Sequence, residues 1–480
     1  MKLMEPLRIN STTIHCRVLV PAMVTRLSGE DGYVNQAIRD RYVRYAMGEV
    51  GLLVVEAMAI HGNKSGPLLR ISEDRFIPGL RDMVREVHEA SDTKIVPQII
   101  HFLKISRRGW RQKVEDLSRE EIKLIVEQFG NAAYRARQAE FDGVELHMAH
   151  AYTMSSFLSM RNKRKDEYGG KTLEDRMRAM GEVITRVRQA VGDDFAVGVR
   201  FDAEEGIKKG YTLNDSREFA LRMAQLGADY ISLSAGGKFE DAIIRPGHIV
   251  YPYTGYSGDK CMPGDYYPDG TNLYLAEGIK RYLVERGYQT PLVCAGKISH
   301  AEHAEEILQK GWADIIGMAR ANLADADWAK KVREGREKEI IRCIYCNVCK
   351  NLDETHNEVI CYLWPKGTLH APLWKPGGNP VWPTDGKLTA AVTPSEIKLS
   401  WEEASHADGV CGYDLFRREG DGQYEWFTAT TRTNYRDQLA IAGRAYKYYV
   451  QAYTEAGMRS TPTEVVEATI PFPDYATASA

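Results

Sequence analysis

Short apolar runs alternate with amphipathic segments through roughly the first 340 residues of the chain. The apolar runs lie at residues 18–23, 51–59, 94–101, 143–149, 195–201, 228–235, 291–298 and 313–319. Most are apolar nearly throughout, which is typical of parallel strands that are covered on both faces. Helical patterns lie between them, for example at residues 118–140, 173–191 and 322–335. Ser118 and Glu121 form a capping box at the start of the first of these helices.

Eight strand–helix units of this kind predict an α/β fold, a (β/α)8 TIM barrel over residues 1–340. A doubly wound sheet is the alternative. It is disfavoured because no G-x-G-x-x-G motif follows any of the predicted strands.

The pattern changes after Cys361. Residues 366–386 are rich in proline and glycine and are typical of a linker. Residues 387–475 alternate apolar and polar positions, at 397–401, 412–417 and 445–453, with turn residues between them. This predicts an all-β immunoglobulin-like sandwich. Trp401 and residues 446–457 resemble the early tryptophan and the penultimate strand of fibronectin type III domains. The sandwich has no titratable cluster, so we expect packing or docking to be its role.

Composition excludes several classes of function. Hydrophobic residues are 44% and charged residues 27%, as in globular proteins, and the net charge of −3 gives no sign of a nucleic-acid partner. No apolar run approaches the ~20 residues that span a bilayer, and the first residues lack the apolar core of a signal peptide. We therefore expect a cytoplasmic protein without membrane insertion.

Four of the eight cysteines fall close together. Cys343, Cys346 and Cys349 form a C-x2-C-x2-C run, and Cys361 follows twelve positions later. Three thiolates from one loop and a fourth from the returning chain suit a [4Fe-4S] cluster, which would occupy residues 341–365. Zinc is the first alternative, although zinc sites usually present two separated C-x2-C pairs. Free or disulfide-bonded cysteines are the second.

Polar residues cluster at the ends of the predicted strands, where TIM barrels place their chemistry. His147 and His150 follow the fourth strand, and Tyr152 lies two residues further on. Two imidazoles can donate hydrogen bonds to one carbonyl oxygen, and a phenol can supply a proton to the neighbouring carbon. The alternative of a metal site at the histidine pair is disfavoured because no carboxylate follows at a suitable spacing.

At this point the chain resembles the Old Yellow Enzyme family of flavin oxidoreductases. The similarity is carried by residues 141–152, 157–158, 162–164, 166–170 and 174–176. Residues 313–320 and the cysteine run resemble its iron–sulfur branch, which includes 2,4-dienoyl-CoA reductase and trimethylamine dehydrogenase. The resemblance covers residues 5–365. That branch continues into further FAD and pyridine-nucleotide domains, whereas this chain continues into the β-sandwich.

The resemblance implies bound FMN and gives His147, His150 and Tyr152 the catalytic roles described above. The residues expected to hold FMN are Pro21, Ala22, Met23, Ala57, Gln98, Arg200, Gly296, Lys297, Ala319 and Arg320. Gln98 would bind the pyrimidine edge and Arg200 would stabilise charge near N1 of the flavin. Gly296 and Arg320 would receive the phosphate. Met23 offers no cysteinyl link, so FMN should be bound non-covalently.

These residues predict an FMN- and [4Fe-4S]-dependent ene-reductase that acts on an α,β-unsaturated carbonyl compound, with enoyl- and dienoyl-CoA thioesters as candidates. An amine dehydrogenase and an electron-transfer subunit of a larger complex are the alternatives. NAD(P)H and a redox partner protein both stay open as electron donors, and we expect a homo-oligomer. The basic, tryptophan-bearing loop at residues 101–113 is either a CoA-phosphate contact or a solvated loop. Residues 251–271 are expected to form a lid.

Overall fold

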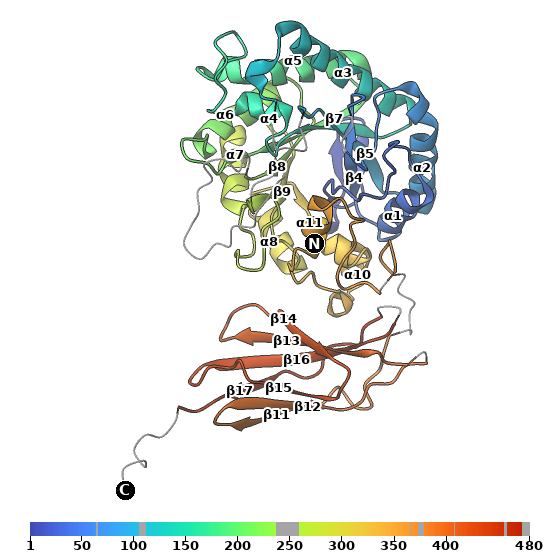
Figure 1. The fold of residues 1–480 in the computed structure, drawn as a ribbon, viewed down its shortest axis with the longest axis vertical. Coiled ribbons are helices and arrows are strands. Elements are labelled where there is room, and N and C mark those ends of the chain that lie inside the picture. Colours follow the sequence, from blue (N-terminus) through green and yellow to red (C-terminus); the bar gives the residue numbers. More distant parts are fainter. Residues whose placement is uncertain are drawn as a thin grey trace. The chain divides into compact units, whose positions relative to one another are not determined.

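Eight parallel strands close into a barrel in the order β10-β3-β4-β5-β6-β7-β8-β9 (Figure 1). They are β3 (Val18–Val20), β4 (Leu52–Ala59), β5 (Lys94–Ile100), β6 (Gly143–Met148), β7 (Ala196–Asp202), β8 (Tyr230–Ser234), β9 (Leu292–Ala295) and β10 (Ile315–Gly317). Each strand lies within a predicted apolar run or one residue beyond it, so the predicted TIM barrel is confirmed. The computed structural model describes residues 1–63, 66–104, 112–236, 259–365, 367–372, 379–407, 409–455 and 458–472.

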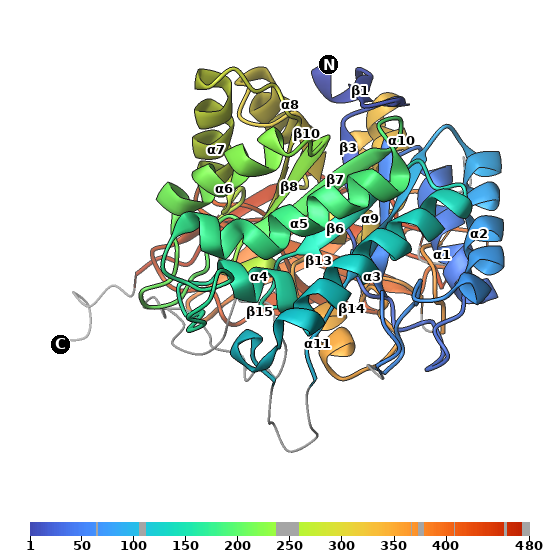
Figure 2. The ribbon, with the colours of Figure 1, turned by 90° about the horizontal axis from the view of Figure 1, so that it is seen from above.

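Helices surround the barrel strands (Figure 2). They are α1 (Gln36–Met47), α2 (Ile77–Ala90), α3 (Arg119–Gln138), α4 (Thr153–Leu158), α5 (Leu173–Val191), α6 (Leu213–Gln225), α7 (Leu273–Glu285) and α8 (Ala301–Gln309). The predicted capping box opens α3: Glu121 N donates to Ser118 Oγ at 3.1 Å, and Ser118 N donates to Glu121 Oε2 at 2.7 Å. Short 3-10 turns lie at Lys2–Met4, Asp74–Phe76, Val114–Asp116, Asp259–Cys261 and Glu337–Glu339.

A β-hairpin that the sequence analysis did not predict closes one end of the barrel. Its strands, β1 (Leu7–Ile9) and β2 (Thr12–Ile14), pair antiparallel. Ile9 and Ile14 pack into a buried cluster with residues at the start of the barrel strands, among them Leu52, Ala196 and Ile315. The hairpin thus covers the end of the barrel at which the strands begin and leaves the end at which the strands finish uncovered by it.

The single helix predicted at residues 322–335 is wrong. Two helices occupy this region, α9 (Ala319–Ala324) and α10 (Trp328–Arg333), and a seven-residue helix, α11 (Val348–Glu354), follows. Asp325 separates the first two because its backbone is extended (φ −136°) and its Oδ1 accepts a hydrogen bond from Asp327 N at 3.1 Å. This local side-chain bond competes with the helix, as is common for aspartate.

Two compact units divide the chain: Met1–Arg333 with Tyr345–Tyr362, and Glu334–Ile344 with Leu363–Ala480. The second contains a three-stranded sheet of order β11-β12-β15 and a four-stranded sheet of order β14-β13-β16-β17, all antiparallel. The strands are β11 (Leu388–Thr393), β12 (Glu396–Trp401), β13 (Gly412–Glu419), β14 (Glu425–Thr430), β15 (Asn434–Asp437), β16 (Ala445–Tyr453) and β17 (Val466–Thr469).

Both sheets contribute to one apolar core, in which Ile397 and Leu399 of β12 meet Leu415 of β13 and Val450 of β16. The predicted all-β sandwich is therefore confirmed.

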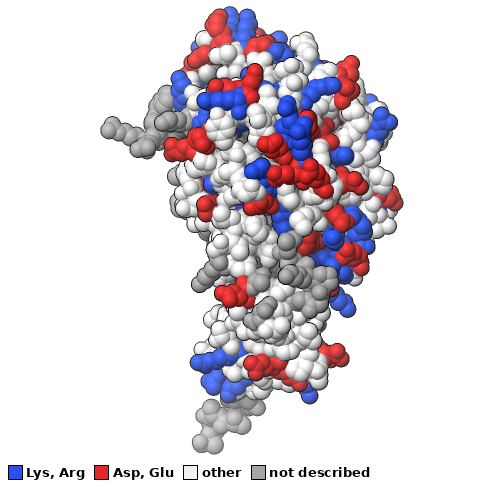
Figure 3. Space-filling view, turned by 90° about the vertical axis from the view of Figure 1, so that its right-hand side faces the viewer, with Lys and Arg blue, Asp and Glu red and all other residues white. Residues whose placement is uncertain are grey.

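The surface carries charges of both signs, which are interspersed on the face shown in Figure 3. This mixture agrees with the small net charge of −3. Across the described ranges, no helix has the length and apolar character needed to cross a membrane.

A buried ion pair fixes the break between α9 and α10, and it provides a test of the fold. Lys331 Nζ donates to Asp325 Oδ2 at 2.7 Å, and the exposed fractions of the two side chains are 1% and 0%. Replacing Lys331 by Met would leave the Asp325 carboxylate buried without this cation. We expect Lys331→Met to lower the free energy of unfolding by about 3–5 kcal/mol, measured by urea denaturation.

The neighbouring Lys330→Met is the matched control, because Lys330 pairs with Glu49 at 3.3 Å from a side chain that is 38% exposed. Lys330→Met should lower the free energy of unfolding by less than about 1 kcal/mol. Equal losses in the two variants would contradict the assignment of the structural role to the buried pair.

Candidate active site

A cavity with about 1190 Å³ of empty space, part of it open to solvent, lies at the ends of the barrel strands. Every residue that the sequence analysis placed at the flavin or the substrate lines it. These residues are Pro21, Ala22, Met23, Ala57, Gln98, His147, His150, Tyr152, Arg200, Gly296, Lys297, Ala319 and Arg320. Strands and turns that are separated by up to 300 positions in the sequence therefore meet at one site.

One layer of the barrel interior positions Gln98. Gln98, Glu145, Gly198 and Tyr230 are in register on β5, β6, β7 and β8. A Cβ atom at Gly198 would lie 2.0 Å from the Tyr230 ring, so the glycine makes room for that ring. Tyr230 OH then donates to Glu145 Oε2 at 3.1 Å, and Gln98 Nε2 donates to Glu145 Oε1 at 2.6 Å. Because Nε2 is the donor, the amide oxygen of Gln98 stays available to a ligand.

Arg200 lies beside this layer, in register with His147 on one side and Ser232 on the other. Its side chain is buried, and its Nη1 makes no hydrogen bond to any described residue. Burying a guanidinium N–H without a partner costs free energy unless a ligand accepts a hydrogen bond from it. The structure therefore offers a cationic donor at the inner wall of the cavity.

A chain of hydrogen bonds orders the two histidines. Ala149 N donates to His147 Nδ1 at 3.3 Å, so the neutral His147 ring carries its proton on Nε2. His147 Nε2 lies 3.1 Å from His150 Nδ1, which must then accept. His150 in turn carries its proton on Nε2, which lies 2.6 Å from Ser234 Oγ. The bonds thus determine both tautomers in the ligand-free arrangement.

Both imidazoles are neutral near pH 7. Burial and, to a smaller extent, the Arg200 guanidinium lower the pKa of His147 to about 3. Burial, His147 and Arg200 together hold the pKa of His150 well below its usual range. Each ring therefore has a single N–H, and the pair can polarise a carbonyl by hydrogen bonding rather than by full positive charge. The Tyr152 ring packs edge-on against His147 with centroids 5.1 Å apart.

The opposite end of the cavity is suited to an anion. Gly296 adopts φ +132°, a conformation that L side chains rarely adopt, and a Cβ there would lie 2.8 Å from Asn272 Nδ2. Arg320 Nη1 donates to Pro263 O at 2.8 Å and to Asn347 Oδ1 at 2.6 Å. Lys297 Nζ instead donates to Asp265 O at 2.9 Å and to Tyr267 O at 2.5 Å, so it also holds the 265–267 segment in place.

Comparison with known proteins identifies the family. The sequence pattern of the NADH:flavin oxidoreductase / NADH oxidase family matches residues 2–250 and 263–339, which is more than half of the chain. The chain belongs to this family. The resemblance to flavin oxidoreductases is thereby confirmed, and the barrel is that of a family of flavin-dependent enzymes.

Three relatives illustrate the similarity. The NADH oxidase of Thermoanaerobacter brockii is 33% identical over 362 residues, which are 71% of this chain and 52% of that protein. The N,N-dimethylglycine/sarcosine dehydrogenase of Chromohalobacter salexigens is 28% identical over 476 residues, 93% of this chain and 64% of that protein. A solved 2-naphthoyl-CoA reductase shares the fold, with a TM-score of 0.66 and 23% identity over 75% of this chain and 56% of that one.

This chain spans about half the length of the first of these relatives. The match to the dehydrogenase, at 93% of this chain, also extends past residue 365, where the resemblance was expected to stop.

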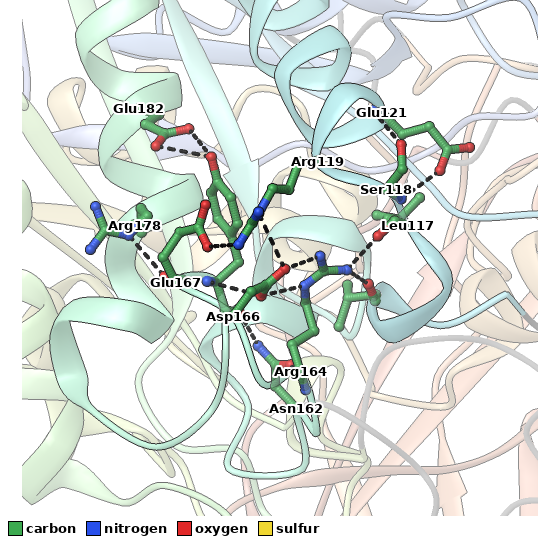
Figure 4. A network of polar contacts seen from close by, with 12 residues as sticks. Leu117, Ser118, Arg119, Glu121, Asn162, Arg164, Asp166, Glu167, Arg178 and Glu182 are labelled. Carbon is green, nitrogen blue, oxygen red and sulfur yellow. Dashed lines mark hydrogen bonds and ion pairs between the residues drawn. The ribbon is translucent and has the colours of Figure 1, made fainter.

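The family resemblance at residues 162–170 has a structural explanation (Figure 4). Arg164 pairs with Asp166 through Nε at 3.0 Å and Nη2 at 2.5 Å, and its Nη1 donates to Val114 O and Leu117 O at 2.6 Å. Arg119 Nη2 at the start of α3 donates to Glu167 Oε2 at 2.7 Å. This part of the motif therefore ties the connection between β6 and α5 to the start of α3, while His147, His150 and Tyr152 line the cavity.

The cysteine segment contacts the cavity as well. Cys349 lines it, together with Tyr345, and the Lys297 ammonium and Arg320 guanidinium lie 4.6 and 4.9 Å from the centre of the Tyr345 ring. All four cysteines of the run are free of disulfides. Within the described part of the chain, no three His, Cys, Asp or Glu side chains are arranged as metal ligands. The [4Fe-4S] cluster therefore stays a prediction from the spacing of the cysteines.

Sequence reasoning missed several residues of the site. Ser234 and Cys261 contact His150, and Glu56 and Glu145 are carboxyls buried beneath the cavity. Glu145 lies within the family similarity at 141–152 and Cys261 within the expected lid, but the sequence marks none of the four as a site residue because their partners lie far away along the chain. The expected lid at 251–271 is described only from residue 259 on, where Cys261, Met262 and Pro263 line the cavity. Arg107, Arg108, Trp110 and Arg111 of the basic loop lie outside the described residues.

Glu56 provides a pH-dependent test of this region. It accepts hydrogen bonds from Thr25 N at 2.5 Å and from Thr25 Oγ1 at 2.8 Å, and burial raises its pKa from 4.5 to about 7. Between these values the folded protein keeps a proton that the unfolded chain has released. The free energy of unfolding should therefore fall as the pH rises through this window, by up to roughly 1.4 kcal/mol per pH unit.

In Glu56→Gln, which mimics the protonated form, this contribution should be missing. Urea denaturation of both proteins at pH 5 and pH 8 measures it as a difference between the two slopes. Parallel pH profiles of the wild type and the variant would contradict the raised pKa of Glu56.

Proposed function

We propose that the protein is an FMN-dependent ene-reductase, which reduces the C=C bond of an α,β-unsaturated carbonyl compound and takes an enoyl- or dienoyl-CoA thioester as substrate. The observation that supports this most directly is the group of His147, His150 and Tyr152 on one wall of the cavity. The two neutral N–H groups can donate to the carbonyl oxygen of the substrate, which gains negative charge during the reduction. The phenol can supply the proton that the neighbouring carbon needs.

The residues of the cavity fit FMN. The free amide oxygen of Gln98 can accept from the pyrimidine N–H, and the unpartnered Nη1 of Arg200 can donate to the pyrimidine oxygen side. At the other end, Nε and Nη2 of Arg320 make no hydrogen bond to the described residues and are available to a phosphate. Met23 has no nucleophile, so the flavin would be held without a covalent bond.

The chain's own residues would act on the substrate as follows, and bound reduced FMN would supply the hydride. His147 and His150 donate to the carbonyl oxygen, and the negative charge that builds there strengthens both bonds. To do so they give up the 3.1 Å bond between them, a loss of about 0.5–1.5 kcal/mol that the oxygen must offset. Tyr152 delivers its phenolic proton to the carbon next to the carbonyl.

Oxidation of an amine is the second candidate function. It is favoured by the match to an N,N-dimethylglycine/sarcosine dehydrogenase, which spans 93% of this chain. A neutral histidine pair is compatible with an amine, because burial lowers the pKa of both histidines. We rank it second because His147, His150 and Tyr152 have no evident role in removing hydride from an amine. A third reading, an electron-transfer subunit, would leave the same residues without any role.

We propose that Cys343, Cys346, Cys349 and Cys361 hold a [4Fe-4S] cluster. The support for this proposal is the spacing of the four cysteines, three from one loop and the fourth from the returning chain. Cys349 also lines the cavity, which would place the cluster beside the flavin. Electrons would then enter from NADH or from a redox partner protein. The strand orders of the three-stranded and four-stranded sheets support the fibronectin type III-like assignment of the β-sandwich. A docking role for the sandwich and a homo-oligomeric state stay predictions from the sequence.

Iron content tests the cluster. Protein purified without oxygen should contain about four iron atoms per chain, and Cys346→Ser should lower the iron content while leaving FMN in place. Cys411→Ser is the matched control, because Cys411 is also exposed but lies outside the run. One zinc per chain with no iron would favour the alternative metal, and equal iron loss in both variants would exclude the proposed ligand set.

The catalytic assignment is tested by the two half-reactions measured separately. Reoxidation of the reduced, FMN-loaded protein by an enoyl-CoA should be slowed on the order of 10²–10⁴-fold in Tyr152→Phe, because the variant keeps the ring but lacks the proton. Reduction of the flavin by NADH should be unchanged. His147→Ala should slow reoxidation on the order of 10²–10³-fold.

The wild-type protein decides between the functions. Flavin reoxidation by the enoyl-CoA supports the ene-reductase, and flavin reduction by dimethylglycine supports the amine dehydrogenase. If Tyr152→Phe slows both half-reactions equally at full FMN occupancy, Tyr152 is not the proton donor.

A further inference from the structure

His150 has contacts on its far side that the reaction as described does not use. Its Nε2 lies 2.6 Å from Ser234 Oγ at the end of β8 and 3.3 Å from the Sγ of Cys261. Its backbone N–H donates to Asp202 Oδ2 at 2.6 Å, and its backbone is in the left-handed region at φ +61°. Asp202 and Ser234 are in register on β7 and β8. The ring is thus held over two neighbouring strand ends.

The ligand-free arrangement cannot present two donors to one substrate oxygen. In it, His147 Nε2–H is directed at His150 Nδ1, and His150 carries its only proton on Nε2, toward Ser234. For His150 to donate to an oxygen on the side of Nδ1, the proton must be on Nδ1 instead. Nε2 is then a bare acceptor in a buried place, and it needs a donor of its own.

We propose that the Ser234 hydroxyl sets the tautomer of His150. It accepts from Nε2–H when the cavity is empty, and it turns to donate its own proton to bare Nε2 when Nδ1–H binds the substrate oxygen. One ring proton moves from Nε2 to Nδ1, so the net charge and the number of protons are unchanged. This inference rests on the proposed function, since it assigns a positioning residue to the same site.

A hydroxyl suits this role because it can both donate and accept, which its neighbours cannot do as well. The Cys261 thiol is a weak donor at a longer distance. Asp202 Oδ1 lies 3.8 Å from Nε2, beyond hydrogen-bond range. The Arg200 guanidinium can only donate hydrogen bonds. Together with burial and His147 it lowers the pKa of His150, and it therefore disfavours the doubly protonated imidazolium both with and without a ligand.

The test uses full-length, FMN-loaded protein and the inert oxyanion 4-nitrophenolate, whose oxygen accepts two hydrogen bonds and whose absorption reports binding. Ser234→Ala should weaken binding about tenfold, the effect of losing one neutral hydrogen bond. Ser234→Thr, which keeps the hydroxyl, should retain the affinity. Ser232→Ala is the matched control, because Ser232 lies two residues away on β8 and its buried Oγ makes no hydrogen bond to the described residues.

A spectroscopic measurement reads the tautomer itself. In protein with ¹⁵N-labelled histidine, protonated and bare ring nitrogens have well-separated shifts, and His150→Asn assigns the signals. The proton of His150 should be on Nε2 in the free protein and on Nδ1 in the nitrophenolate complex. In Ser234→Ala the shift to Nδ1 should be incomplete at saturating ligand.

Several results would overturn the proposal. They are unchanged affinity in Ser234→Ala, equal weakening in Ser234→Ala and Ser234→Thr, and a proton that stays on Nε2 in the complex. A greater loss in Cys261→Ala than in Ser234→Ala would assign the role to the thiol instead. If the wild-type protein reduces no enoyl substrate, the proposed function fails, and the tautomer measurement still tests this inference by itself.

Discussion

Closure of the barrel is the constraint on which the rest of the structure depends. Because all eight strands are parallel, their carboxyl ends meet at one rim, and residues from Pro21 to Arg320 line one cavity there. Closure also forces side chains into the interior in layers. In the layer of Gln98, Glu145, Gly198 and Tyr230, the Glu145 carboxyl accepts hydrogen bonds from both the Gln98 amide and the Tyr230 hydroxyl. Gln98 lines the cavity and is therefore held in place by two residues, Glu145 and Tyr230, that lie outside the cavity lining.

The sequence predicted the barrel and the residues of its rim because both depend on local patterns. Apolar runs mark each strand, and the polar residues that line the cavity lie near the ends of these runs or directly after them. Ser234, Cys261 and Glu56 were missed because their importance comes from neighbours across the barrel. The β1–β2 hairpin was missed because strands of three residues are too short to show a period. The prediction of one helix at 322–335 was wrong because Asp325 interrupts it. The Asp325 side chain accepts hydrogen bonds from the backbone N–H of Asp327 and from Lys331 Nζ.

The burial of the histidine pair has a physical consequence for the chemistry. A charged imidazolium would polarise a carbonyl more strongly than a neutral ring, yet removal from water and the nearby Arg200 favour the neutral form. In the proposed reaction the direction in which each ring donates its N–H would therefore matter more than its charge. The groups that hold His150 from behind, Ser234 and Asp202, would then help to set the direction in which it donates.

The cysteine segment is held to the rim by bonds that do not involve the thiols. Arg320 Nη1 donates to Asn347 Oδ1 at 2.6 Å, Val359 N donates to Thr25 O at 2.8 Å, and Arg41 Nη2 donates to Val359 O at 2.8 Å. Two of these bonds link the segment to the turn that follows β3 and to α1, and the third links it to Arg320, the residue suited to a phosphate. The barrel therefore sets the position of residues 345–362, and this explains why Tyr345 and Cys349 line the cavity.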